Sequence, residues 1–365
     1  MSDTKQCPLC GETILEVAIK CKHCGSMLSG ESPSAGSLQW IANTLSPKFD
    51  ISREVGRGGM ASIYLGYQKN LRREVAVKVI HRHLAGDQDF VKRFVNEGRS
   101  TAKLDHPNII KVFDTGAIGG LSYLSMQFLH GTDLSTYIRE KGKLTTEEAI
   151  RIVAQIADAL NYIHKHGMVH RDIKCSNIFI KDDGTPILMD FGIVHASENT
   201  KLTMTGAVLG TPQYMSPEQA RGQAASAQSD IYSLGVVLYY CLSGKLPFTG
   251  DNNLSIITKI ISEHPVQLRD YEPGCPKWLA DIVHKSMAKS ASDRYATGIE
   301  LANALTDGLK AHDLSLEGAK RLNEEEEQRK NETVKTPITA NKQEPTTPQG
   351  QKIIKPKRNL VFIVS

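Results

Sequence analysis

The spacing of apolar residues along the chain changes near residue 129. Before that point, short runs rich in valine, isoleucine and tyrosine are separated by glycine and polar turns, a pattern typical of β-strands. The runs are ISREVG (51–56), ASIYLGY (61–67), EVAVKVI (74–80), IIKVFDTGAI (109–118) and LSYLSMQFL (121–129). One segment differs, because in DFVKRFVNEGRSTAKL (89–104) Phe90, Phe94 and Val95 recur at helical spacing. We therefore expect a mostly β lobe that carries one helix.

Helical patterns dominate after Leu129. The segment TTEEAIRIVAQIADALNYIHKHG (145–167) has acidic residues in its first turn and a glycine at its end, which are the usual start and stop signals of a helix. SDIYSLGVVLYYCLSG (229–244) and PKWLADIVHKSMAK (276–289) are further helices with apolar faces. The pattern predicts a second, helical lobe.

Segments of different composition flank the two lobes. Residues 1–28 are rich in cysteine, and GESPSAGS (30–37) is small, polar and turn-prone, as linkers are. After about Asp313 the apolar pattern fades into a charged stretch and then a run rich in proline, threonine, lysine and glutamine, which favours disorder. The chain thus divides into a cysteine-rich unit (1–28), a linker (29–47), a two-lobed domain (48–312) and a disordered tail (313–365).

Composition narrows the class of protein only slightly. The 365 residues are 40% hydrophobic and 23% charged with a net charge of +4, which is ordinary for a soluble globular protein. A balance this mild argues neither for nor against nucleic-acid binding. The sequence opens without the pattern of a signal peptide and holds no run of about 18 apolar residues, so the cytosol is the expected compartment.

Four motifs stand out, and each alone has an ordinary structural explanation. EVGRGGMASIYLG (54–66) is typical of a flexible hairpin turn, and Lys78, at the end of VAVK, of a surface residue on a strand. The cluster in VHRDIKCSNIFI (169–180) suits a satisfied polar turn, and LMDFG (188–192) suits a plain Asp-x-Gly turn. Their order is more informative, because a glycine turn, a strand lysine, HRD-x-x-x-x-N and DFG follow one another before SPE (216–218).

This ordered set of motifs resembles the signature of the bacterial Hanks-type, or eukaryotic-like, serine/threonine protein kinases, over about residues 49–312. The resemblance implies an α+β, bilobal protein-kinase fold with a β-rich N-lobe and a helical C-lobe. It also implies a signalling enzyme that uses ATP to phosphorylate serine and threonine hydroxyls on protein substrates, including its own activation loop. Self-association would then allow one chain to phosphorylate another.

The resemblance assigns chemical roles to four charged residues. Asp172 is expected to accept the proton of the substrate hydroxyl, and Lys174 to steady the γ-phosphate in the transition state. Lys78 is expected to hold the α- and β-phosphates while paired with Glu97 on the charged helix. Lys174 also favours serine and threonine over tyrosine as substrates, with Thr211 placed to bridge Asp172 and Lys174.

ATP and its metal ion account for the other positions of the implied site. Magnesium, or manganese in its place, prefers oxygen ligands, which Asn177 and Asp190 supply. The glycine turn lets backbone N–H groups approach the phosphates closely. The residues implied to contact ATP are Gly56, Arg57, Gly58, Gly59, Ile63, Ala76, Lys78, Met126, Gln127, Leu129 and Phe179. The apolar side chains among them would enclose adenine, and backbone groups of Gln127 and Leu129 would bind its edge; packing in the core is the alternative explanation for each apolar residue.

Five further residues match structural features of the family or depart from them. Glu218 and Arg294 resemble its buried ion pair in the helical lobe, and Asp230 resembles the residue that braces the catalytic loop. Ala61 replaces the third glycine of the loop, which should stiffen the turn slightly. Cys175 stands where proline or alanine is usual, and we expect a buried, unreactive thiol there.

The loop between DFG and SPE is polar and contains several threonines. Thr203 and Thr205 resemble the paired autophosphorylated threonines of bacterial relatives. A phosphate on either would add negative charge able to order the loop through Arg171, which precedes the catalytic aspartate. The alternative is that both are ordinary solvated loop residues.

The N-terminal cysteines form two C-x2-C pairs, each followed by a glycine. Each pair resembles a zinc knuckle, and Cys7, Cys10, Cys21 and Cys24 would supply the four thiolates of a closed, structural Zn2+ site. Four free thiols, two disulfides or bound iron are the alternatives. A unit this small buries little surface, so metal should provide most of its folding free energy. The sequence leaves open whether this zinc ribbon binds protein, a second copy or nucleic acid.

Two functions of other classes compete with an active kinase. A pseudokinase would use the same fold as a nucleotide-responsive binding module, but Lys78, Glu97, Asp172, Asn177 and Asp190 are all retained. A zinc-dependent nucleic-acid binder would carry the kinase fold as an accessory, and the weakly basic composition makes nucleic acid an unlikely partner.

The final residues, KIIKPKRNLVFIVS (352–365), place four cations before five consecutive apolar residues. Five residues cannot span a bilayer, yet cations before an apolar run match the cytoplasmic flank of a membrane helix. A membrane partner is therefore expected only if the chain continues beyond Ser365, which would make this the cytoplasmic part of an anchored kinase. A soluble hydrophobic end is the alternative.

Overall fold

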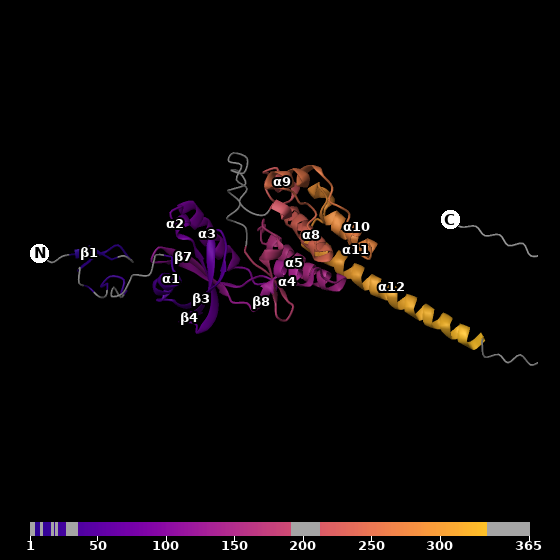
Figure 1. The fold of residues 1–365 in the computed structure, drawn as a ribbon, viewed down its shortest axis with the longest axis horizontal. Coiled ribbons are helices and arrows are strands. Elements are labelled where there is room, and N and C mark those ends of the chain that lie inside the picture. Colours follow the sequence, from indigo (N-terminus) through magenta and orange to yellow (C-terminus); the bar gives the residue numbers. More distant parts are fainter. Residues whose placement is uncertain are drawn as a thin grey trace, which may run out of the picture. The chain divides into compact units, whose positions relative to one another are not determined.

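The computed structural model of the protein describes residues 4–7, 10–15, 18, 21–26, 36–190 and 212–333, to which all structural statements refer. The chain falls into two units, Met1–His312 and Asp313–Ser365. The first unit contains a strand-rich N-lobe and a helical C-lobe (Figure 1). The predicted α+β, two-lobed fold is therefore confirmed.

The N-lobe is built on a five-stranded antiparallel sheet with the order β3-β4-β5-β7-β6. Its strands are β3 (Phe49–Arg57), β4 (Ala61–Gln68), β5 (Arg73–Ile80), β6 (Val112–Ile118) and β7 (Leu121–Gln127). Side chains alternate along β5, so Val75 and Val77 join one apolar cluster while Ala76 and Ile80 join another. The same alternation places Lys78 on the side of Ala76 and Ile80.

Helix α3 (Gln88–Thr101), which follows the short α2 (Arg82–Ala85), packs on that side of the sheet. Its Phe90 and Phe94 are buried at helical spacing, as the sequence predicted. Asp87 begins the helix, because its carboxylate accepts hydrogen bonds from the N–H groups of residues 89 and 90. This helix presents Glu97 to the interior of the lobe.

The opposite apolar cluster of the sheet is completed by helix α1 (Leu38–Leu45). Trp40, Ile41 and Leu45 are buried among strand residues, and the Ser37 hydroxyl begins the helix by accepting the Trp40 N–H at 3.2 Å. The prediction of a linker over residues 29–47 is therefore wrong for this helix. The turn-prone composition ends at Ser37, and the apolar residues that follow are stabilised by burial against the sheet.

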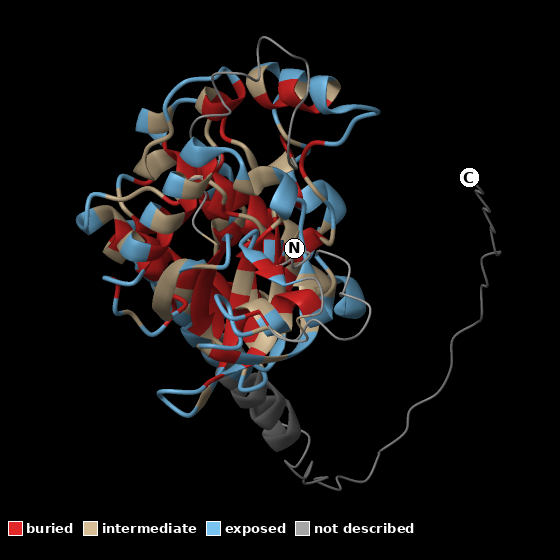
Figure 2. Cartoon of the chain, turned by 90° about the vertical axis from the view of Figure 1, so that its left-hand side faces the viewer, coloured by how far each residue is buried: buried red, intermediate tan, exposed pale blue. Residues whose placement is uncertain are grey.

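The C-lobe consists mainly of helices. They are α4 (Leu134–Lys141), α5 (Thr146–Lys165), α7 (Pro217–Ala220), α8 (Ala227–Ser243), α9 (Asn253–Ser262), α10 (Leu268–Tyr271), α11 (Lys277–Ser286) and α12 (Gly298–Thr333). Helix α8 is apolar around most of its circumference and is buried along nearly its whole length, as expected of a helix surrounded by others. Figure 2 shows buried residues gathered along the inner elements of the fold. The three helices predicted after Leu129 are confirmed as α5, α8 and α11.

A three-stranded sheet with the order β10-β9-β8 carries the polar motifs of the C-lobe. Its strands are β8 (Gly131–Asp133), β9 (Ile178–Lys181) and β10 (Pro186–Leu188). Gly131 has a φ of +137°, and a Cβ there would lie 2.1 Å from the Ile180 carbonyl oxygen, so only glycine allows this close strand approach. The sheet places the HRD-x-x-x-x-N motif before β9 and Asp190 two residues after the end of β10.

Helix α12 extends to Thr333 and so enters the tail that was predicted to be disordered. That prediction is wrong for residues 313–333, because this stretch is rich in glutamate, lysine, arginine and leucine, which favour helix even without a core. None of the described helices is both long enough and apolar enough to cross a membrane. The apolar end of the chain and the threonines Thr203, Thr205 and Thr211 lie outside the described residues.

Candidate active site

Asp172, Lys174 and Asn177, which were predicted to form the catalytic loop, lie within one short segment (170–177) between α5 and β9. The Lys174 ammonium donates to Asp172 Oδ2 at 2.7 Å. Asn177 Nδ2 donates to the same Asp172 oxygen at 2.9 Å and to the Asp172 backbone carbonyl at 2.8 Å. The Lys174 ammonium and the Asn177 amide nitrogen therefore fix the Asp172 carboxylate. Because the Asn177 nitrogen is used in this way, its amide oxygen is the atom that could bind a metal ion.

Lys78 of β5 meets Asp190 across the two lobes. Its Nζ lies 2.7 Å from Asp190 Oδ1. Burial alone would lower the pKa of Lys78, but Asp190, Glu97 and Asp172 together raise it above its ordinary value. Burial alone would raise the pKa of Asp190, but the charge and hydrogen bond of Lys78 hold it below its ordinary value. Both groups are therefore charged at neutral pH.

The predicted pair between Lys78 and Glu97 is wrong for this structure. Among the described residues Lys78 pairs with Asp190, and Glu97 forms no ion pair. Glu97 is 8% exposed. Burial raises the pKa of Glu97 to about 8; Asp190 and Asp172 reinforce the rise, and Lys78 opposes it. The Lys78 charge therefore still acts on Glu97, but the Lys78 ammonium forms its ion pair with Asp190.

Asp230 of α8 holds the backbone of the catalytic loop, which confirms its predicted bracing role. The N–H groups of His170 and Arg171 each donate to the buried Asp230 carboxylate at 2.8 Å. Arg171 has a φ of +70°, a conformation that costs a non-glycine residue about 1–3 kcal/mol. His164 of α5, which the sequence reasoning missed, also bonds to Asp230, with its Nε2 at 2.8 Å from Oδ2.

His170 links the catalytic loop to the Asp190 segment. Its ring is fully buried, and burial lowers the pKa of the imidazole, so the ring is neutral. Nε2 donates to the Met189 carbonyl at 2.9 Å, and Nδ1 accepts the Asp172 N–H at 3.3 Å. One imidazole therefore holds the residue before Asp190 and the backbone of Asp172 together.

The structure also brings together most of the residues predicted to contact adenine. Ala76 and Met126 are buried in one apolar cluster, against which Ile63, Leu129 and Phe179 pack. These side chains come from β4, β5, β7, β9 and the segment after β7. Such an apolar cluster between the lobes suits the faces of an aromatic base.

Two of the predicted nucleotide contacts are already occupied within the protein. The Arg57 guanidinium pairs with Glu54 on its own strand, at 2.6 and 2.8 Å. The Gln127 N–H donates to the Lys111 carbonyl at 2.9 Å, so at most its carbonyl is left to bind an adenine edge. Gly56 lies near the end of β3 opposite Ile63, and Gly58 and Gly59 lie in the β3–β4 turn, which the Gly58 N–H closes on the Ala61 carbonyl at 2.9 Å.

The four N-terminal cysteines converge as predicted. All four Sγ atoms lie within 4.8 Å of one another. Sγ of Cys7 lies 3.8 Å from that of Cys24, and Sγ of Cys10 lies 3.7 Å from that of Cys21. A tetrahedron with metal–sulfur bonds of about 2.3 Å has edges of about 3.8 Å. The thiols are free, so the alternative of two disulfides is contradicted.

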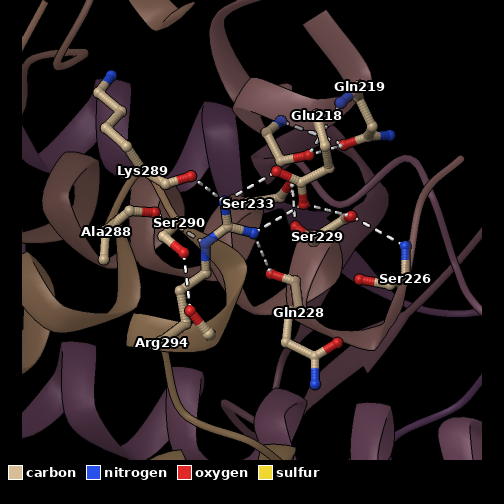
Figure 3. Close-up of polar contacts among 12 residues, drawn as sticks. Glu218, Gln219, Ser226, Gln228, Ser229, Ser233, Ala288, Lys289, Ser290 and Arg294 are labelled. Atoms are coloured by element: carbon tan, nitrogen blue, oxygen red, sulfur yellow. Dashed lines mark hydrogen bonds and ion pairs between the residues drawn. The ribbon is translucent and has the colours of Figure 1, made fainter. Parts of the chain in front are cut away.

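A buried ion pair within the C-lobe joins Glu218 of α7 to Arg294, which lies between α11 and α12 (Figure 3). Arg294 Nη1 and Nη2 donate to the two carboxylate oxygens of Glu218 at 2.7 and 2.8 Å. Burial would raise the pKa of Glu218, but Arg294 and the Ser229 hydroxyl lower it to about 2. The predicted Glu218–Arg294 pair is confirmed. Cys175 is also buried as predicted, and burial raises the pKa of its thiol to about 12.

Fold and site together define the protein kinase class: a β-sheet lobe and a helical lobe that share a cluster of lysines, carboxylates and an asparagine. The family model described as "Protein kinase domain" matches residues 49–308. The chain therefore belongs to the protein kinase family.

Similar proteins support this assignment. The chain is 39% identical to the serine/threonine-protein kinase PrkC of Bacillus subtilis over 261 residues, which are 72% of this chain and 40% of that protein. It is 40% identical to the serine/threonine-protein kinase PknB of Mycobacterium leprae over 262 residues, 70% of this chain and 42% of that protein. The matched part is thus less than half of each relative. The crystal structure of the Mycobacterium tuberculosis PknI kinase domain matches with a TM-score of 0.59 and 25% identity, over 71% of this chain and 96% of that one.

Proposed function

We propose that the chain is an ATP-dependent serine/threonine protein kinase. The observation that carries the proposal is the convergence of polar side chains from three separated segments: Lys78, Asp190, and the catalytic loop with Asp172, Lys174 and Asn177. Phosphoryl transfer needs positioning and charge neutralisation rather than covalent chemistry, and this set offers two cations, two carboxylates and an amide. The names of the similar proteins support serine and threonine as the hydroxyls that are phosphorylated.

Each residue of this set has a distinct role in the proposal. Asp172 is the base for the substrate hydroxyl, and Lys174, which bonds to it, supplies positive charge beside the transferred phosphate. Asn177 and Asp190 would hold Mg2+ or Mn2+, because amide and carboxylate oxygens are the ligands these ions prefer. The bound ion would neutralise phosphate charge. Lys78 would hold the α- and β-phosphates of ATP.

One observation favours the alternative of a pseudokinase. In the structure Lys78 forms its ion pair with Asp190, one of the proposed metal ligands, and not with Glu97. An active enzyme must therefore exchange this ion pair for contacts with nucleotide and metal. Because Lys78 and Asp190 are both charged, the exchange needs only a change of partner, and we retain the active kinase as the proposed function.

Phosphate mapping after incubation with ATP and magnesium tests this proposal. We expect transfer to serine and threonine, and none to tyrosine, of a basic protein substrate that contains all three residues. Because we also propose autophosphorylation between associated chains, we expect phosphate on Thr203 or Thr205 of the chain itself. Mass spectrometry of substrate and enzyme is the measurement, and Asp190→Asn protein is the inactive control. Nucleotide binding without any transfer would instead support the pseudokinase.

We further propose that residues 1–28 form a zinc ribbon, separate from a kinase domain that includes α1 and ends near residue 312, with 313–365 as a tail. The four thiols lie at tetrahedral spacing, and the main-chain turns that present them are closed by Gly11 and Gly25 N–H groups bonded to the Cys7 and Cys21 carbonyls at 2.9 Å. The closed set of four sulfur ligands leaves no open position for a reaction. The metal would therefore be structural.

Elemental analysis is expected to find about one zinc per chain. Replacement of Cys7 and Cys10 by serine should abolish zinc binding, because two of the four ligands are lost. Cys275→Ser is the matched control, since it removes a thiol of the C-lobe and should leave zinc unchanged. Wild-type protein without bound metal would contradict the site, and stoichiometric iron in place of zinc would correct its identity.

A further inference from the structure

Gln219 of α7 is a buried amide whose two ends both form hydrogen bonds. The side chain is 5% exposed. Oε1 accepts the Ser216 N–H at 3.1 Å and the Ser216 hydroxyl at 3.0 Å. Nε2 donates to the Arg171 backbone carbonyl at 3.0 Å. Because a backbone N–H can only donate, Oε1 must be the atom that faces Ser216, and the orientation of the amide is therefore determined.

The Arg171 carbonyl belongs to the peptide unit that joins Arg171 to Asp172. The N–H of this unit donates to His170 Nδ1 at 3.3 Å, and its carbonyl accepts from Gln219. Since a peptide unit is planar, these two hydrogen bonds together fix its orientation. That orientation in turn sets the direction in which the Asp172 side chain points.

The backbone of Arg171 needs such support, because its φ of +70° lies in the left-handed region. Its N–H is held by Asp230 of α8 at 2.8 Å, and its carbonyl by Gln219 of α7. Two side chains from two helices thus hold both polar groups of the residue. In Figure 3 Gln219 lies beside Glu218, whose pairing with Arg294 ties α7 to the segment between α11 and α12.

We infer that Gln219 is a positioning residue for catalysis, which holds the peptide unit before Asp172 so that the Asp172 carboxylate faces the substrate hydroxyl. The inference rests on the proposed kinase activity. Gln219 touches neither substrate nor nucleotide in this role; it acts through the backbone of the catalytic loop. A loss of the amide should therefore change kcat and leave the KM for ATP nearly unchanged.

Gln219→Glu selectively tests the hydrogen bond from Gln219 to the Arg171 carbonyl. The glutamate has the same length and keeps an oxygen for both Ser216 donors, but when ionised it cannot donate to the Arg171 carbonyl. We expect kcat to fall about 10- to 100-fold, as small misplacements of a catalytic group do. The KM for ATP should change by less than about two-fold. Protonation of the glutamate restores a donor, and burial raises the pKa of a carboxyl group, so kcat relative to wild type should recover as the pH falls.

Two comparison variants separate positioning from general stability. Gln219→Met removes all three hydrogen bonds of the amide without adding charge, and its loss of kcat should not recover at low pH. This variant also tests the inference if Gln219→Glu does not fold. Gln228→Glu is the matched control, because Gln228 Nε2 also donates to a backbone carbonyl, that of Ala296 at 3.2 Å, away from the loop. It should keep the wild-type kcat.

The outcomes distinguish the inference from the function on which it rests. Inactive wild-type protein would overturn both. With active wild-type protein, an unchanged kcat in Gln219→Glu and Gln219→Met would overturn the positioning role alone. An equal loss in both variants at every pH, accompanied by a lower melting temperature, would also overturn it, because only a structural role predicts that result.

Discussion

Replacement of Asp172 by asparagine is expected to lower kcat for phosphoryl transfer by a factor on the order of 10²–10⁴, the usual contribution of a positioned general base. The melting temperature should change little. Asparagine keeps an oxygen that accepts from Lys174 Nζ and Asn177 Nδ2, which lie 2.7 and 2.9 Å from Asp172 Oδ2, but it is too weak a base to take a hydroxyl proton. Steady-state kinetics and a thermal melt of each protein are the measurements.

Asp183→Asn is the matched control for this prediction. Asp183 pairs with Lys181 at 2.7 Å, the same distance and the same two-residue spacing as the Asp172–Lys174 pair, but on an exposed turn. The identical substitution should leave kcat at the wild-type value. Wild-type turnover in Asp172→Asn protein would contradict the catalytic assignment, whereas equal losses in both variants would show that the assay reports a nonspecific effect of charge.

Replacement of Arg294 by methionine is expected to lower the free energy of unfolding by about 3–5 kcal/mol, the cost of removing one partner from a buried ion pair. For a domain of this size that is a fall in melting temperature of about 10 °C. The Arg294 side chain is fully buried, and besides Glu218 it donates to the carbonyls of Ala288, Gln228 and Lys289 at 2.8, 2.9 and 3.1 Å. Methionine would fill the space but leave these acceptors and the Glu218 charge without their donor.

The pH dependence of this loss has a defined sign. Arg294, together with the Ser229 hydroxyl, lowers the pKa of Glu218 from 4.5 to about 2, although burial opposes the shift. The stabilisation is thus fully present above about pH 4.5 and is lost as the pH falls towards 2, so the gap between wild type and Arg294→Met should narrow over that interval. Lys277→Met is the control, because Lys277 pairs with Asp281 on an exposed helix face and should contribute less than about 1 kcal/mol. A loss no larger than that of Lys277→Met would contradict the structural importance of the Glu218–Arg294 pair.

The parts of the site that could be predicted from the sequence depend on contacts between near neighbours in the chain. Asp172, Lys174 and Asn177 bond to one another over separations of two and five residues, so their motif carries most of their geometry. The start of α5 at Thr145, whose hydroxyl accepts the Glu148 N–H at 3.2 Å, is local in the same way.

Local propensity was misleading where a segment gains stability from a distant surface, or needs none. Helix α1 was missed because it follows a turn-prone stretch; it is stabilised by burial of Trp40 and Leu45 against the N-lobe sheet. The charged continuation of α12 was expected to be disordered because it has no core, although its residues favour helix by themselves.

By itself, the sequence determined the fold class, the order of the elements, and which lysine, aspartate, asparagine and cysteine side chains form the two candidate sites. Only the tertiary structure decided which residues far apart along the chain form ion pairs and hydrogen bonds with each other. Lys78 pairs with Asp190 over 112 residues rather than with Glu97, and Gln219 reaches the Arg171 carbonyl over 48. The physical reason is that a buried cation or amide bonds to whichever group packing brings within about 3 Å. That choice depends on differences of a few ångströms between elements, which the spacing of residues along a chain does not encode.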